Sequence, residues 1–323
     1  MRIGFLGTPE VAVVALRRLV EDPRIDVEVV VTNPDRPAGR GRRLVASAVK
    51  VEAEARAIDV LQPDRARDLL PELGPRGLDA CAVVAYGSIL PAEVLAATRL
   101  GFVNLHFSLL PRWRGAAPVQ HALRAGDTTT GVTVFRLDEG MDTGPILRQR
   151  SVAISEDDDT GSLLDRLATI GADELADALV DLDAGVVPVS QPEAGVTLAP
   201  RIERADVVID WTRPAMEISR LVRSAAPRPG ATTSFRGEGL RVLSAVDADA
   251  RDSSADASPE ALLPGSIVER TRGQLAVACG DGRVLDLRRV QVAGRRAVDV
   301  HAFLNGHDPQ RGEVLGRGSA GDR

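Results

Sequence analysis

The sequence predicts an α/β protein with a doubly wound, mostly parallel sheet, followed by a smaller domain of short strands. In residues 1–182, short apolar segments alternate with amphipathic ones, as strands and helices do in a doubly wound sheet. Residues 78–85 form a nearly continuous apolar run, typical of a central parallel strand covered on both faces. Beyond residue 211, short apolar segments alternate with glycine-containing turns, which favours a small β-barrel. We therefore expect a Rossmann-like sheet first and a barrel after it.

Apolar periodicity places the individual elements of the first part. The expected strands are Arg2–Leu6, Val27–Thr32, Leu78–Ala85, a strand through Asn104, Gly131–Leu137, and one more after Pro145. The expected helices are Pro9–Glu21, Val45–Ala57, Pro91–Thr98, Ala117–Ala125 and Asp157–Leu182. Acidic residues at the start of the last helix suit the dipole of a helix N-terminus.

The second part is separated from the first by residues 183–202, a segment rich in glycine and proline that we interpret as a linker. We expect domain boundaries at residues 1–182 and 203–311, and a disordered glycine-rich tail at 312–323. The acidic segment Ala248–Pro259 is expected to be a mobile loop. The expected helix and strands of this domain are Pro214–Ser224, Thr232–Phe235, Leu240–Ala245, Gly265–Glu269, Gln274–Ala278 and Val284–Val292.

Composition excludes several classes of protein. The chain has 323 residues, of which 44% are hydrophobic and 27% charged, as in ordinary globular proteins. No apolar run approaches the roughly 20 residues that span a bilayer, and the chain begins directly in a strand, so we expect a cytoplasmic protein. Cys81 and Cys279 lie far apart in apolar segments, which favours buried reduced thiols and no metal site. A net charge of −6 disfavours strong non-specific binding of nucleic acid.

The first strand-to-helix turn argues against a dinucleotide cofactor. Gly4 and Gly7 stand three residues apart and lack the G-x-G-x-x-G spacing that lets a backbone approach a pyrophosphate. No acidic residue ends the second strand, where one would hold the ribose of NAD. The sequence therefore predicts no NAD.

Residues 102–108 (F-V-N-L-H-F-S) carry the strongest chemical signal. The alternation of a strand would turn Asn104, His106 and Ser108 to one face and the apolar residues between them to the core. An amide, an imidazole and a hydroxyl at the end of a strand suit carbonyl chemistry. The same pattern also fits polar residues that only satisfy each other or a turn.

A second polar segment favours the chemical interpretation. Residues 138–144 (D-E-G-M-D-T-G) follow the strand Gly131–Leu137 and form a loop at a strand end, where ligand sites of α/β sheets lie. A carboxylate at Asp142 could reach an imidazole on the neighbouring strand.

These and other motifs resemble those of the folate-dependent formyltransferases over nearly the full chain. The shared trio is Asn-x-His at 104–106, Ser-Leu-Leu-Pro at 108–111 and Asp-Thr-Gly at 142–144. The segments Pro-Asp-Arg-Pro-Ala-Gly-Arg-Gly at 34–41 and Arg-Trp-Arg-Gly-Ala-Ala-Pro at 112–118 are most similar to the branch that formylates a charged tRNA. The resemblance implies transfer of a formyl group from 10-formyltetrahydrofolate to methionine on the initiator tRNA, and an OB-like second domain that contacts tRNA. The implied reaction requires no metal, and the resemblance implies no membrane partner. We expect a monomer.

The resemblance also implies roles for individual residues. Asn104 would donate to the developing oxyanion, and His106 would donate to it or shuttle a proton. Asp142 would orient His106 and raise its pKa, or hold the water that relays the proton. The pterin of the folate would lie against walls formed by the residues Ile89, Leu90, Ser108, Leu109, Leu110 and Pro111.

Residues 36–43 form a basic loop with four arginines and two glycines. Such a loop suits phosphate contacts on the acceptor end of tRNA, for which we select Arg36, Arg40 and Arg42; a merely solvated loop is the alternative. The same trio of motifs serves formyltransferases that act on glycinamide ribonucleotide or nucleotide sugars, and deformylating hydrolases. A nucleic-acid-binding module on a decayed α/β domain is a further alternative, against which the intact Asn104, His106 and Asp142 argue.

Overall fold

The computed structural model describes residues 1–38, 43–248, 263–271 and 273–317. The chain forms two compact units, each with its own fold. The first unit comprises residues 1–118, 128–154 and 163–200, and the second comprises residues 119–127, 155–162 and 201–323. The second unit therefore includes two short segments, 119–127 and 155–162, that come from the earlier part of the chain.

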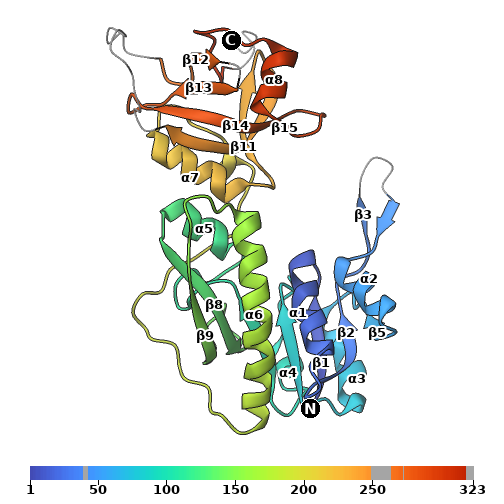
Figure 1. The fold of residues 1–323 in the computed structure, drawn as a ribbon. Coiled ribbons are helices and arrows are strands. Elements are labelled where there is room, and N and C mark those ends of the chain that lie inside the picture. The colour runs from blue at the N-terminus through green and yellow to red at the C-terminus, as the bar shows by residue number, and fades with distance from the viewer. Residues whose placement is uncertain (39–42, 249–262, 272, 318–323) are drawn as a thin grey trace. The chain divides into compact units, whose positions relative to one another are not determined.

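A seven-stranded mixed sheet lies at the centre of the first unit (Figure 1). In spatial order its strands are β5 (Asp59–Leu61), β2 (Asp26–Val31), β1 (Arg2–Gly7), β6 (Ala80–Val84), β7 (Phe102–His106), β8 (Thr129–Arg136) and β9 (Ile146–Ala153). The strands from β5 to β7 are parallel, whereas β8 and β9 are antiparallel. The predicted mostly parallel sheet is confirmed. Helix α5 (Pro118–Ala125) lies between β7 and β8 in the chain and belongs mainly to the second unit.

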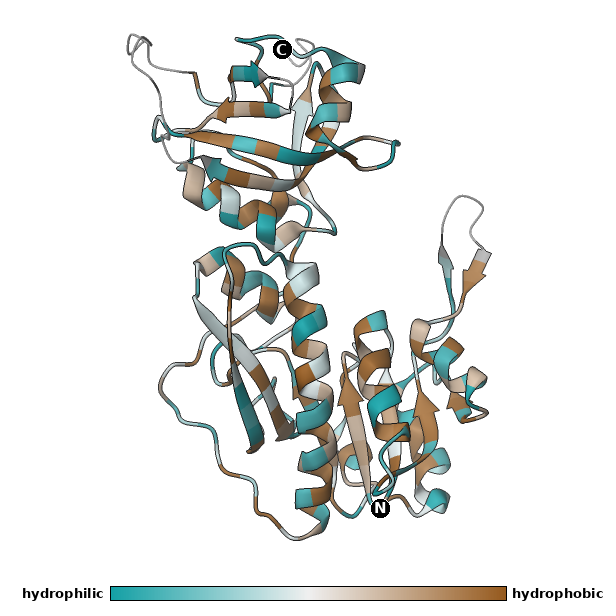
Figure 2. Ribbon diagram, in the orientation of Figure 1, coloured by the Kyte–Doolittle hydropathy of each residue, from teal (hydrophilic) through white to brown (hydrophobic). Residues whose placement is uncertain are grey.

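Close approaches at small residues fix the helices against this sheet. Helix α1 (Glu10–Val20) packs on β1, β2 and β6 (Figure 1), and a Cβ on Gly7 would lie only 2.8 Å from that of Ala12. Helix α6 (Thr160–Asp183), banded polar and apolar in Figure 2, brings Gly171 against Leu105 of β7, where a Cβ would lie 2.7 Å from Leu105 Cδ1. The remaining helices of the first unit are α2 (Ala48–Ala55), α3 (Leu70–Leu73) and α4 (Ala92–Leu95), with 3-10 turns at Ala66–Leu69 and Gly74–Arg76. None of the described helices is long and apolar enough to cross a membrane.

The basic segment has regular structure where it is described. Strand β3 (Arg36–Ala38) pairs in antiparallel fashion with β4 (Arg43–Val45), so its two ends form the arms of a hairpin rather than an irregular loop. The helix expected from Val45 begins instead at Ala48, because the Ser47 hydroxyl accepts a hydrogen bond from the Lys50 N–H at 3.0 Å and caps the helix there.

The base of this hairpin is tied to the sheet by the only lysine of the chain. Lys50 Nζ donates to Asp35 Oδ2 at 2.9 Å and to Gln62 Oε1 at 2.8 Å. Gln62 Nε2 in turn donates to the carbonyl oxygen of Asn33 at 3.0 Å and to Asp35 Oδ1 at 2.8 Å. These contacts fix the residue that immediately precedes β3.

An antiparallel sheet of six strands forms the second unit. Its strands are β10 (Ala231–Phe235), β11 (Glu238–Ala248), β14 (Val284–Val292), β13 (Gln274–Ala278) and β12 (Ile267–Thr271) in spatial order, with β15 (Val298–Asp299) paired to β14. Besides most of α5, the unit contains helices α7 (Ala215–Ala225) and α8 (Val300–His307) and a 3-10 turn at Ala205–Val207. The predicted domain of short strands is confirmed, whereas its OB-like closure stays a prediction.

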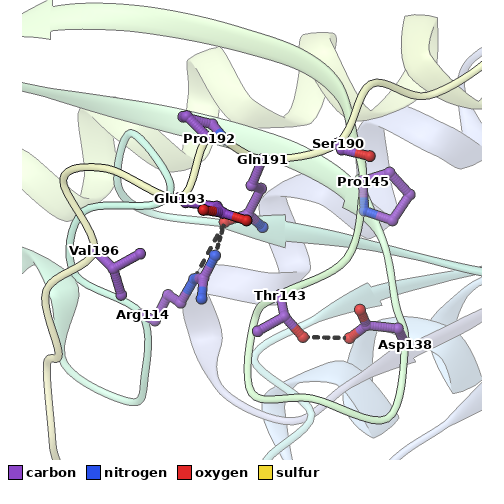
Figure 3. Close-up of a pocket in the computed structure, with 9 residues that line it drawn as sticks. All are labelled: Arg114, Asp138, Thr143, Pro145, Ser190, Gln191, Pro192, Glu193 and Val196. Carbon is purple, nitrogen blue, oxygen red and sulfur yellow. Dashed lines mark hydrogen bonds between the residues drawn. The ribbon is translucent and has the colours of Figure 1, made fainter.

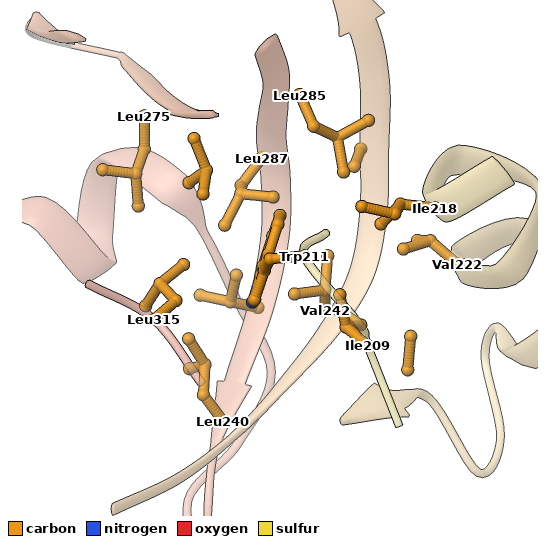
Figure 4. Close-up of a cluster of buried hydrophobic side chains, with 14 of the residues drawn as sticks. Ile209, Trp211, Ile218, Val222, Leu240, Val242, Leu275, Leu285, Leu287 and Leu315 are labelled. Carbon is orange, nitrogen blue, oxygen red and sulfur yellow. The ribbon is translucent and has the colours of Figure 1, made fainter. Parts of the chain in front are cut away.

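The second unit has its own apolar core (Figure 4). Trp211 lies at its centre and donates from Nε1 to Thr233 Oγ1 at 3.0 Å. Leu315 is buried in the same core, and the Gly316 N–H donates to the carbonyl oxygen of Ser234 at 2.9 Å. The expected disorder from residue 312 is therefore wrong for residues 312–317, which the sheet holds through backbone hydrogen bonds. Residues 318–323 and most of the expected mobile loop, residues 249–259, lie outside the described residues.

Candidate active site

Strand β7 brings two of the candidate residues to the middle of the sheet. Asn104 pairs with Val83 of β6 on one side and Phe135 of β8 on the other, and His106 ends the strand. Asn104 is half-buried, but His106 is only 6% exposed and Ser108 is fully buried. The loop after β7 folds back over the strand end, where the Trp113 carbonyl oxygen contacts His106, so the last two of these side chains are covered.

Both ring nitrogens of His106 face oxygen atoms. Nε2 lies 2.9 Å from the carbonyl oxygen of Trp113, and Nδ1 lies 3.7 Å from Asp142 Oδ2. A carbonyl oxygen can only accept, so Nε2 carries hydrogen and Nδ1 is the nitrogen that can gain or lose a proton. The imidazole and Asp142 therefore lie within reach of one bridging water.

Burial dominates the protonation of His106. Removal of the imidazole from water lowers its pKa below the ordinary value, while the charge of Asp142 and the Trp113 carbonyl oppose that shift. Asp142 does raise the pKa, as expected, but the net direction is downward because desolvation is the larger effect. Burial therefore favours the neutral ring, in which the lone pair lies on Nδ1.

Asp142 is held at both its side chain and its backbone. It lies between β8 and β9 with a left-handed φ of 53°, a conformation uncommon for residues other than glycine. Oδ2 accepts a hydrogen bond from the Gly115 N–H at 2.8 Å, and the Asp142 carbonyl oxygen accepts one from Gln191 Nε2 at 2.8 Å. Gly115 has φ 125°, and a Cβ there would lie 2.6 Å from the carbonyl oxygen of Ala199.

The segment that supplies Gln191 and Ala199 was expected to be a plain linker. Residues 189–199, which we call the strap, instead run along the first unit. Val189 exchanges backbone hydrogen bonds with Ile146 at 2.7 and 2.8 Å, and the Arg114 N–H donates to the Thr197 carbonyl oxygen at 2.9 Å. Sequence reasoning also missed Arg114, Gly115 and Gln191; the glycine inside the Arg-Trp-Arg-Gly motif was a usable signal for Gly115, and no pattern marked Gln191.

The Ser-Leu-Leu-Pro segment is fixed to the neighbouring strands. The Ser108 hydroxyl donates to the carbonyl oxygen of Arg112 at 2.6 Å. The Leu110 N–H donates to Thr133 Oγ1 at 3.0 Å, and the Leu110 carbonyl oxygen accepts from Gln149 Nε2 at 2.8 Å. These bonds hold the segment as a stiff wall.

The expected folate contacts divide into two groups. Leu90, Ser108, Leu110 and Pro111 are buried, whereas Leu109 is half-buried and Ile89 is 91% exposed. Only Ile89 and Leu109 therefore offer much side-chain surface, and the buried members act as support behind it.

A pocket of about 470 Å³ lies beside this arrangement in the first unit (Figure 3). It does not include Asn104, His106 or Asp142, but Thr143 follows Asp142 directly and Gln191 binds its carbonyl oxygen. Two hydrogen bonds join residues of the pocket lining. Thr143 Oγ1 donates to Asp138 Oδ1 at 2.7 Å, and Arg114 Nη2 donates to Gln191 Oε1 at 2.6 Å. The lining residues are Arg114, Asp138, Thr143, Pro145, Ser190, Gln191, Pro192, Glu193 and Val196.

The candidate tRNA residues are only partly described. Arg36 is exposed on β3, whereas Arg40 and Arg42 lie outside the described residues. Cys81 and Cys279 are free and buried, as expected, and burial raises the pKa of each thiol to about 12. Among the described residues, no group of three or more His, Cys, Asp or Glu side chains is placed to hold a metal ion.

Curated relatives extend over the whole chain. The protein named methionyl-tRNA formyltransferase from Streptomyces coelicolor is 44% identical over 320 residues, covering 98% of this chain and 100% of the relative. That of Methylibium petroleiphilum is 45% identical over 315 residues, covering 94% and 96%.

Solved structures share the fold at low identity. A variant of HypX from Aquifex aeolicus has a TM-score of 0.67 at 17% identity, covering 97% of this chain but about half (48%) of HypX. The N-formyltransferase of Helicobacter canadensis has a TM-score of 0.62 at 16% identity, covering 88% of this chain and 98% of that one.

Family comparison accounts for both units. Residues 1–179 match the formyl transferase family, and residues 201–308 match the formyl transferase C-terminal domain. The first match alone covers more than half of the chain, so this protein belongs to the formyl transferase family.

Proposed function

We propose that this protein transfers the formyl group of 10-formyltetrahydrofolate to the α-amino group of methionine on the initiator tRNA. One observation supports the choice of methionyl-tRNA as the acceptor. Relatives named methionyl-tRNA formyltransferase match the chain over both units. We assign catalysis to residues 1–182, connection of the two domains and support of the site through the strap to 183–202, and tRNA contact to 203–311 together with Arg36, Arg40 and Arg42 of the basic segment.

Catalysis is assigned to Asn104, His106 and Asp142. The amine attacks the formyl carbon, and the electron pair of its C=O bond moves onto oxygen. The side-chain amide of Asn104, on the central strand β7, donates to that oxyanion, a contact worth about 3–4 kcal/mol when it is preorganised.

His106 moves the proton that the reaction must transfer. With Nε2–H committed to the Trp113 carbonyl oxygen, Nδ1 accepts the proton of the attacking amine. The carboxylate of Asp142, 3.7 Å away, stabilises the imidazolium that forms. Nδ1 then gives the proton to the departing folate nitrogen as the carbon–nitrogen bond breaks, which leaves tetrahydrofolate and N-formylmethionyl-tRNA.

The folate contacts proposed from the sequence remain Ile89, Leu90 and Ser108–Pro111. Support comes from the fixed geometry of Ser-Leu-Leu-Pro and from the exposed surface of Ile89. Backbone groups of this wall other than the Leu110 N–H and carbonyl oxygen, which Thr133 and Gln149 engage, would bind the polar edge of the pterin.

We also propose a cytoplasmic monomer. The proposed acceptor, initiator tRNA, is used where translation begins, and each unit carries a buried apolar core of its own. Sedimentation of the purified protein measures the oligomeric state directly.

Competition among acceptors tests the proposed reaction. The purified protein and 10-formyltetrahydrofolate are incubated with Met-charged initiator tRNA, uncharged tRNA, glycinamide ribonucleotide, or water alone. Formylation of the charged tRNA only is the expected result. Equal or faster transfer to glycinamide ribonucleotide, or release of formate in water, would assign the chain to another branch of the family.

A further inference from the structure

The strap enters the candidate active site through the side chain of Gln191. Its Nε2 donates to the carbonyl oxygens of Asp142 and Gly144, each at 2.8 Å. Its Oε1 accepts from Arg114 Nε at 3.2 Å and Nη2 at 2.6 Å (Figure 3). Two carbonyls can only accept and a guanidinium can only donate, so this orientation of the amide is the one that satisfies every partner.

The turn that Gln191 binds is the one that needs support. Asp142 has a left-handed φ of 53°, and such a residue persists only where its surroundings fix it. A Cβ on Gly144 would lie 1.8 Å from the Arg136 carbonyl oxygen, so the turn is also pressed against the end of β8. The Gly115 N–H fixes the Asp142 carboxylate, whereas Gln191 fixes the backbone on both sides of Thr143.

We propose that Gln191 is a positioning residue for the formyl transfer, acting through Asp142 rather than on either substrate. Its amide clamps the 142–144 turn so that the Asp142 carboxylate stays beside His106 Nδ1. Arg114 holds the amide in its working orientation. The inference rests on the proposed function, because it assigns Gln191 to the same reaction.

Two substitutions of Gln191 remove its hydrogen bonds to the 142–144 turn while preserving the length of the side chain or its pairing with Arg114. Gln191→Met keeps the length of the side chain and removes every hydrogen bond. Gln191→Glu keeps the pairing with Arg114 but cannot donate to the two carbonyls. Both should lower kcat about tenfold or more, since a shift of a catalytic group by about 1 Å costs up to roughly a hundredfold. The KM values for folate and tRNA should change less than kcat.

A double-mutant cycle tests whether the effect passes through Asp142. In an Asp142→Asn background, Gln191→Met should cost little further activity. Val187→Ala, at a position 80% exposed and close to the strap, is the matched control and should behave as wild type. Circular dichroism and thermal unfolding verify that each variant is folded.

The outcomes are distinguishable. Wild-type kcat in Gln191→Met, or full additivity with Asp142→Asn, would overturn the inference while the formyl transfer of the wild-type protein upholds the proposed function. A loss in Gln191→Glu alone would assign the effect to the added charge and would also overturn it. Wild-type protein that formylates no charged tRNA would instead overturn the proposed function.

Discussion

Each of the three proposed catalytic side chains has a separate structural reason for its position. Asn104 is placed by pairing on both sides of β7, His106 by the Trp113 carbonyl oxygen, and Asp142 by the Gly115 N–H. Preorganised groups of this kind act on the transition state and contribute little to ground-state binding. The three should therefore be separable from substrate binding by kinetics.

Alanine at Asn104, His106 or Asp142 should each lower kcat on the order of a hundredfold or more, with folate affinity changed much less. Steady-state formylation and folate binding by calorimetry supply the two measurements. A folded variant that turns over like wild type would remove that residue from the mechanism.

The pKa of His106 provides a second test at the same scale. NMR titration should place it below the ordinary value near 6.5, because burial opposes the charged ring. Asp142→Asn should lower it further, since a charge that favours the imidazolium is lost. Activity should then persist below pH 6.5 and fall as Nδ1 becomes protonated.

The free energy of unfolding should also depend on the protonation of His106. The unfolded chain binds the His106 proton more readily than the folded chain, so this group lowers the free energy of unfolding as the pH falls below about 6.5. His106→Gln should flatten that part of the pH–stability curve in urea titrations. A pKa above 6.5 in the folded protein, or a rise in Asp142→Asn, would contradict this account.

At the scale of elements, apolar periodicity predicted the helices and strands, which bury side chains at a regular spacing. It missed the strap, whose position depends on individual hydrogen bonds. The apolar run of β6 and the amphipathic pattern of α6 were sufficient to place both elements, because each buries side chains at a regular spacing. The antiparallel direction of β8 was not predictable in this way, because apolar periodicity is the same in parallel and antiparallel strands. The strap was misinterpreted because its glycines and prolines are typical of linkers, while its role lies in backbone bonds and in one glutamine.

In the candidate site, too, local patterns placed some residues and missed the contacts between distant segments. Alternation placed Asn104 and His106 on one strand, and the loop position of Asp142 suggested its approach to the imidazole. Burial of His106 and Ser108 was missed, because strand alternation describes two faces and says nothing of a loop that folds over one of them. Gln191 lies 49 residues from Asp142, and no local pattern links them.

The prediction for tRNA rests on the basic segment 36–43, of which the structure describes the ends, β3 and β4. Arg36→Ala combined with Arg42→Ala, or Arg40→Ala alone, should raise the KM for Met-tRNA and leave folate binding intact. Each lost phosphate contact should reduce the log–log salt dependence of tRNA binding by about 0.7–0.9. Arg67→Ala, whose side chain is 74% exposed outside the hairpin, is the matched control. Unchanged tRNA kinetics and salt dependence in the double variant would assign tRNA contact to the second domain alone.

At the scale of the whole molecule, two separate apolar cores imply two units whose stabilities can be changed separately. Leu16 is fully buried in α1 of the first unit, and Leu287 is fully buried in β14 of the second. Truncation of either leucine to alanine leaves a cavity and costs about 2–5 kcal/mol. The two buried clusters, within residues 6–102 and 207–315, have no residue in common, so we expect each loss to be confined to its own unit.

Hydrogen exchange measured by mass spectrometry on the two variants tests that independence. Leu287→Ala should speed exchange in peptides of β11, β13 and β14 and leave β1, β2 and β6 as in wild type. Leu16→Ala, the matched substitution, should give the reverse pattern. Formylation assays on the same samples extend the test. Leu287→Ala should weaken use of Met-tRNA more than binding of folate, since the proposed folate contacts lie in the first unit. Faster exchange throughout the chain in either variant would show that the two cores unfold as one cooperative body.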